Sequence, residues 1–131
     1  MKLNDILAAR EPLKRLSEKR FASYKKMREL VKLRKAVEQE FDFYYAEEKK
    51  AVSNYAEHDE NGAPIFLDDG RLRLKDYASK QAFEKEIATL RDTEVDGIER
   101  ITLSEADFRS PDDLPTPDEM IALEAFIDFE D

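Results

Sequence analysis

The feature that most constrains the fold is a run without proline or glycine from about residue 22 to residue 57. Ser23 can cap it, which predicts one helix of roughly 35 residues, near 50 Å at about 1.5 Å per residue. Its apolar residues gather on one stripe, so the helix is amphipathic along its whole length. Such a helix must bury its stripe on another helix of the chain or on a second subunit, as in a coiled coil. The run therefore predicts a mainly helical architecture and favours a homo-oligomer.

A second stripe of the same helix, nearly opposite the apolar one, is basic. It consists of Lys25, Arg28, Lys32 and Lys35, and Phe43 falls on the same side. An exposed Phe beside a row of cations is typical of an interaction surface, although a solvated or self-neutralised face is the plainer interpretation. We take these five residues as the candidate interaction surface. Direct nucleic-acid binding is disfavoured by the net charge of −9.

Charge is sorted along the chain. Residues 1–35 hold 12 Lys/Arg and 4 Asp/Glu, residues 36–91 hold 8 and 13, and residues 92–131 hold 2 and 14. The basic head and acidic tail can neutralise each other within the molecule, pair head to tail between subunits, or meet a charged partner.

The segment before the long helix predicts a first helix near residues 5–18, with Asn4 as its N-cap. Pro12 lies inside this segment. Because proline is costly in a helix interior, either the helix is kinked or a short turn precedes a helix that begins at Pro12.

A hairpin is predicted over residues 63–75. With Asp69-Gly70 as a two-residue type I′ loop, Leu67 would pair with Leu72 and Ile65 with Leu74. Asp76 is expected to cap a helix over residues 76–92, and alternating apolar residues predict a third strand over 97–104 that could extend the hairpin's sheet.

The remaining elements are a loop over residues 105–116 and a terminal helix over 117–127, which opens on the capping box Thr116-Pro117-Asp118-Glu119. The predicted fold is α+β and mainly helical. A long amphipathic helix, within a helical part covering residues 1–57, packs on shorter helices beside a small antiparallel hairpin and a third strand. At 131 residues, the chain is expected to form a single domain, 1–131.

Few residues suit catalysis. The chain has one histidine, His58, and no cysteine, so we expect no Cys/His or Ser/His/Asp arrangement and no His-rich metal site. Residues 57–68 can be laid on an EF-hand loop only poorly, because Pro64 falls where an apolar residue belongs. The three glycines form no phosphate-binding loop. We therefore expect no enzyme, no catalytic residue, no metal and no cofactor.

The charged residues within the first twenty positions leave no apolar run for a signal peptide or a membrane span. We accordingly expect a soluble, cytoplasmic protein without membrane association.

The order of features resembles an uncharacterised family of short proteins encoded in phage and prophage genomes. The resemblance is carried by the charged long helix, the turn Asp59-Glu60-Asn61-Gly62, the helix around Phe83-Glu84-Lys85-Glu86-Ile87, and the closing Leu123-Glu124-Ala125-Phe126-Ile127. It implies a mobile-element origin and no established functional residues. The helix, hairpin, helix order is also similar to prefoldin-type chaperone subunits, from which the third strand and the extra terminal helix depart.

These observations favour a non-enzymatic protein that works through protein–protein contacts, for example as an assembly or accessory factor. One alternative is an acidic mimic of nucleic acid that inhibits a host enzyme, which the acidic tail suggests. A prefoldin-like chaperone is a second alternative.

Overall fold

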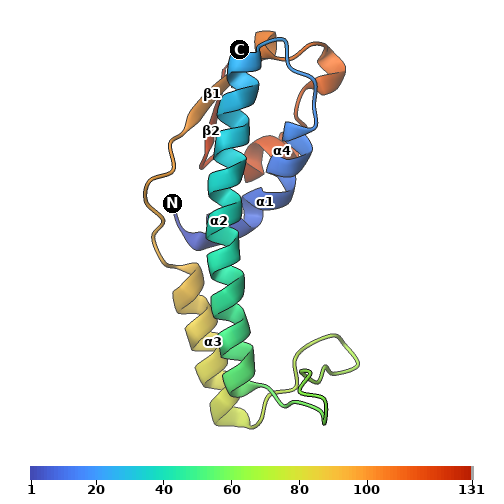
Figure 1. The fold of residues 1–131 in the computed structure, drawn as a ribbon, viewed down its shortest axis with the longest axis vertical. Helices are drawn as coiled ribbons and strands as arrows, with labels where there is room; N and C mark the ends of the chain where they lie inside the picture. The colour runs from blue at the N-terminus through green and yellow to red at the C-terminus, as the bar shows by residue number, and fades with distance from the viewer. Residues whose placement is uncertain (131) are drawn as a thin grey trace. The chain divides into compact units, whose positions relative to one another are not determined.

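The computed structural model describes residues 1–130 and shows a mainly helical chain with one small sheet, which confirms the α+β class (Figure 1). The elements, in chain order, are α1 (Leu3–Ser17), α2 (Tyr24–Tyr55), α3 (Tyr77–Arg91), β1 (Ile101–Ser104), η1 (Glu105–Asp107), η2 (Pro111–Asp113), α4 (Pro117–Ala122) and β2 (Ile127–Glu130).

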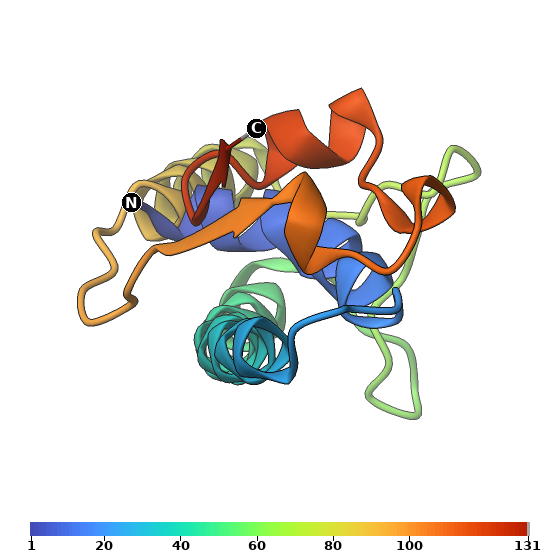
Figure 2. The same ribbon diagram turned by 90° about the horizontal axis from the view of Figure 1, so that it is seen from above.

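The chain divides into two compact units, Met1–Phe41 with Glu94–Asp131 and Asp42–Thr93. Helix α2 contributes its first part to one unit and its second part to the other. That all 131 residues form a single domain stays a prediction. In the first unit, α1 lies between the first part of α2 and α4 (Figures 1 and 2).

Helix α1 begins two residues earlier than predicted. Its N-cap is Lys2 and not Asn4, and the Lys2 backbone N–H donates to Asp5 Oδ2 at 2.8 Å. Asp5, the third residue of the helix, therefore satisfies the backbone N–H of the N-cap residue in the manner of a capping box. Pro12 lies inside one continuous helix and is buried with Leu13, so packing offsets the backbone hydrogen bond that proline cannot make.

Helix α2 confirms the predicted long helix. Ser23 Oγ accepts from the Lys26 backbone N–H at 3.3 Å, and the face bearing Leu30, Leu33 and Val37 is buried. The apolar stripe is nevertheless wider than the buried face. Val31 stays 37% exposed. Phe41, at the end of the first unit's part of α2, is half-buried under the Arg10 guanidinium, whose carbon is 3.9 Å from the ring centre.

The sheet differs from the prediction. Strands β1 and β2 pair in parallel, with Ile101 opposite Ile127 and Leu103 opposite Phe129. A parallel pair needs a long crossover, and the connection through η1, η2 and α4 supplies it. The expected third strand thus exists over Ile101–Ser104, but its partner is the C-terminal segment and not the hairpin.

The prediction of an antiparallel hairpin over residues 63–75 is wrong. This segment carries isolated antiparallel bridges, Phe66 with Leu72 among them, in place of two strands. The register is also shifted by one residue, since Phe66 and not Leu67 lies opposite Leu72. The predicted type I′ turn needs a positive φ at Asp69 as well as at Gly70, and Asp69 does not have one. Among the described residues only glycines have a positive φ, and Gly70 (φ 86°) follows a turn in which its N–H donates to Leu67 O.

Helix α3 agrees with the predicted 76–92 helix. Asp76 is its N-cap and accepts from the Ser79 backbone N–H at 2.6 Å. No residue of α3 is fully buried, and its apolar residues Phe83, Ile87 and Leu90 are half-buried. The second unit therefore lacks an enclosed apolar core along this helix.

The terminal helix is shorter than predicted. Thr116 and Glu119 form the expected reciprocal cap, but α4 ends at Ala122 and the chain becomes strand β2 from Ile127. Ile127 and Phe129 alternate with Asp128 and Glu130, a period of two that suits a strand. Carboxylates at a helix C-terminus would also oppose the macrodipole, so the strand is favoured on both counts.

A basic and apolar surface on helix α2

All four members of the predicted basic stripe lie on the first unit's part of α2, and all are exposed. Their spacing of three and four residues brings them to one side of the helix. Within residues 1–130 none of the four forms an ion pair with an acidic side chain. The basic stripe, defined as Lys25, Arg28, Lys32 and Lys35, is therefore a row of exposed cations in a protein of net charge −9.

A shallow groove of about 410 Å³ accompanies the stripe. Its mainly apolar floor comes from Met27 and Val31, and its polar rim comes from three members of the stripe, Arg28, Lys32 and Lys35. A strip of apolar surface bordered by cations resembles the core and rim of a protein interface on a small scale.

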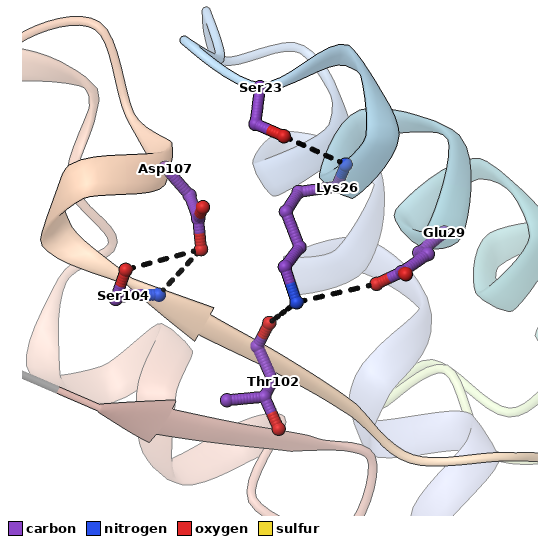
Figure 3. A network of polar contacts seen from close by, with 6 residues as sticks. All are labelled: Ser23, Lys26, Glu29, Thr102, Ser104 and Asp107. Carbon is purple, nitrogen blue, oxygen red and sulfur yellow. Dashed lines mark hydrogen bonds and ion pairs between the residues drawn. The ribbon is translucent and has the colours of Figure 1, made fainter.

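Lys26 serves the fold instead. Its ammonium nitrogen donates to the Thr102 carbonyl of β1 at 2.9 Å and lies 3.6 Å from Glu29 Oε2 (Figure 3). The Ser104 backbone N–H donates to Asp107 Oδ2 at 2.8 Å, which satisfies a further group of β1. These two contacts occupy polar groups of β1 that β2 leaves free, and a lysine at an edge strand discourages pairing with another chain.

A cleft of about 580 Å³ lies beside this network, between α2 and residues 97–102. Its lining carries both signs of charge: Lys26 is held by Glu29, and Arg100 Nη2 lies 2.5 Å from Asp128 Oδ1. Lys26 and Arg100 are thus compensated locally, whereas Lys32 of the basic stripe, which also lines the cleft, forms no ion pair in the described part of the chain. The cleft brings no set of groups together that suits acid–base or nucleophilic chemistry.

Phe43, the fifth predicted residue, belongs to the second unit and is 50% exposed. Its exposure agrees with its predicted position away from the apolar stripe. In the same unit, Tyr44 is buried, and its hydroxyl donates to Glu48 Oε2 at 2.5 Å and accepts from Arg91 Nε at 3.2 Å. Burial, followed by the Glu48 carboxylate, raises the pKa of Tyr44, because both disfavour the phenolate.

The acidic turn after α2 folds on itself. The Asp59 Oδ1 atom accepts from the backbone N–H groups of Asn61 and Ala63, at 2.9 and 3.0 Å. These bonds define an Asx turn. No group of three or more potential metal-ligating side chains comes together within residues 1–130.

The structure also reveals a feature that the sequence analysis missed. Tyr24 is 69% exposed at the start of α2 and lines a pocket of about 270 Å³ with Met27, Lys19, Arg20 and Arg109. Arg109 reaches this pocket because the chain around Phe108 pairs with the chain around Phe21. The spacing of Tyr24, Met27 and Val31 at i, i+3 and i+7 was a signal available in the sequence.

No helix in the described part of the chain is both long and apolar enough to cross a lipid bilayer. Comparisons with protein-family models, with curated proteins and with solved structures find no match for this chain.

Proposed function

We propose that this chain is a non-enzymatic protein that acts through protein–protein contacts, and that the basic stripe of α2 is its contact surface. One observation carries the proposal: four neighbouring cations stay exposed, without an ion pair in the described part of the chain, although acidic residues outnumber basic ones 31 to 22. An acidic patch of a partner is the natural counterpart of such a row.

The positions of the acidic residues support this proposal over self-neutralisation. Several carboxylates of the acidic tail are occupied locally, by a terminal amine, an arginine or a backbone cap. They are Glu94 with the Met1 amino group, Asp128 with Arg100, Asp107 with the Ser104 N–H, and Glu119 with the Thr116 N–H. Each of these groups stabilises its own neighbourhood, and none pairs with the basic stripe.

The groove gives the proposed contact an apolar component. Val31 is 37% exposed and lies beside Arg28 and Lys32, so a partner could bury apolar surface there while its carboxylates meet the cations. A homo-oligomer and a phage-type accessory role stay predictions.

The test reverses the charge of the basic stripe. The variant with Lys25, Arg28, Lys32 and Lys35 all changed to Glu should keep its melting temperature at low salt within about 2 °C, since exposed charges without partners contribute little to stability. The same variant should lose the proteins that cross-link to the wild type in an extract of the source cell. A matched control reverses four exposed cations elsewhere, Lys14, Arg15, Lys80 and Lys85, and should retain them.

Two outcomes would contradict the proposal. A large drop in melting temperature at low salt that is recovered at high salt would show that the stripe neutralises acidic groups of the same protein. Salt-sensitive inhibition of a nuclease or polymerase that survives the reversal would favour the acidic mimic of nucleic acid, whose active groups would be the carboxylates.

A further inference from the structure

An apolar ridge runs along the exposed side of α2 from its first residue. It consists of Tyr24, Met27 and Val31, of which Tyr24 is 69% and Val31 37% exposed, while Met27 is half-buried. Residues at i, i+3 and i+7 of a helix stack above one another. The ridge thus has the spacing of the seam that one helix presents to another in a coiled coil.

Cations flank this ridge on one side and at one end. At about 100° per residue, Lys35, Arg28, Lys32 and Lys25 follow the ridge in that order around the helix. At the N-terminal end, Lys19, Arg20 and Arg109 line the pocket that contains Tyr24 and Met27, against one carboxylate, Glu18. The Arg109 backbone N–H donates to Arg20 O at 3.0 Å, so the fold itself holds these two arginines together.

We propose that the ridge binds an amphipathic helix of a partner protein, which carries apolar residues at heptad spacing and carboxylates along one side of them. This inference rests on the proposed function and specifies its partner. The ridge supplies the apolar seam, Tyr24 an aromatic anchor, and the cations the orientation of the bound helix. From Tyr24 to Lys35 the surface is about 16 Å long, which accommodates roughly three helical turns.

Charge argues against two other occupants. If a second copy docked antiparallel through the same surface about a two-fold axis, the same flank of each helix would meet, and the basic stripes of both copies would face each other and repel. A nucleic acid would satisfy the cations but leave the ridge without an apolar counterpart, and it would meet a protein of net charge −9.

The test uses a synthetic helix as the probe. A fluorescein-labelled peptide of about five turns carries Leu at heptad spacing and Glu along one flank, and its binding is followed by fluorescence anisotropy at physiological salt. One control peptide has the same composition in scrambled order, and a second has Lys in place of Glu. We expect the scrambled peptide to bind at least about tenfold more weakly and the Lys peptide not to bind.

Variants of the protein locate the site. Val31→Asp should weaken the peptide at least about tenfold, whereas Ile121→Asp, at a residue that is 65% exposed on α4, should leave binding unchanged. Circular dichroism and thermal melting verify that each variant is folded. If Val31→Asp unfolds the protein, Tyr24→Ser replaces it, because that side chain is the most exposed part of the ridge.

Three results would overturn the proposal. Equal binding of the scrambled peptide would show that the surface selects charge alone, and the proposed function would survive. If neither Val31→Asp nor Tyr24→Ser affects binding of the designed peptide, its binding site lies outside the ridge. A concentration-dependent dimer in sedimentation that Val31→Asp dissociates would show that a second copy occupies the ridge. Failure of the proposed function itself would show in the cross-linking experiment, which needs no peptide.

Discussion

The first unit of the chain encloses nearly all of its buried apolar side chains, among them Leu13, Leu123 and Phe126, each fully inaccessible to solvent. The second unit buries only Tyr44, Ala51 and Ala56. Its helix α3 presents half-buried residues instead, and several large apolar side chains are exposed, including Phe66 at 59% and Tyr77 at 73%.

The difference shows that helix content and core content are separate properties. Both units are built around the same helix α2, yet a helix is stabilised in proteins mainly by the apolar surface it buries. The first unit packs other elements against one face of α2, whereas the second depends on half-buried contacts, helix caps and side-chain hydrogen bonds. We therefore expect the second unit to open more readily than the first.

The largest effect should come from the first unit's core. Phe126→Ala removes a ring with 0% exposure and should lower the free energy of unfolding by about 3–5 kcal/mol. Phe83→Ala, at a half-buried ring of α3, should cost less than about half of that. Denaturant unfolding measures both. Equal losses would mean that the two units share one cooperative core.

A smaller effect is expected at Tyr44, which provides the second unit's only large buried side chain. Tyr44→Phe keeps the ring but removes a hydroxyl bonded to Glu48 and Arg91, and should cost about 1–2 kcal/mol. Tyr24→Phe, at a 69% exposed ring, is the matched control and should be neutral.

The buried Tyr44 hydroxyl also predicts how the stability of the protein depends on pH. Because burial and Glu48 raise the pKa of Tyr44 above its value in the unfolded chain, the folded state holds this proton more tightly. The associated stability is present below about pH 10 and is lost as the pH rises through the folded pKa. Tyr44→Phe should lessen this alkaline loss, measured as melting temperature against pH. An unchanged alkaline slope would show that other groups cause it.

The next effect is local to α3. Asp76→Ala removes the N-cap, and hydrogen exchange should show α3 opening about fivefold more often, while β1 and β2 are unaffected. The Ser79 N–H lowers the pKa of Asp76, so the cap's stabilisation is present above about pH 4 and is lost as the pH falls through the folded pKa. Asp76→Asn keeps a capping oxygen without titrating there. If acid destabilises α3 in Asp76→Asn as much as in the wild type, titration of Asp76 is not the cause of the loss.

The smallest effect should come from the rim of the first unit. Arg10 lies over the Phe41 ring and donates from Nε to Glu38 Oε2 at 3.2 Å, yet all three groups are partly exposed. Arg10→Gln should therefore cost only about 0.5–1 kcal/mol. A loss as large as that of Phe126→Ala would show that this rim is part of the core.

Local signals predicted much of the helical structure. Ser23, Asp76 and Thr116 cap helices as expected, because an N-cap needs only an oxygen within three residues of the orphan N–H groups. The basic stripe was predictable for the same reason, since residues three and four apart on one helix must share a side. The exposure of Val31 was not predictable, because it depends on which elements pack against that side of the helix.

The sequence by itself determined that α2 and α3 are helices, where the final helix begins, and which side of α2 is charged. Only the tertiary structure decided that β1 pairs with β2, that Lys26 serves the sheet while Lys25 stays exposed, and that Arg109 joins Arg20 beside Tyr24. Helices and caps depend on hydrogen bonds between near neighbours in the chain. Strand pairing and pockets depend on contacts between segments that are distant in the chain. Alternative pairings of these segments differ in free energy only when the rest of the core has formed.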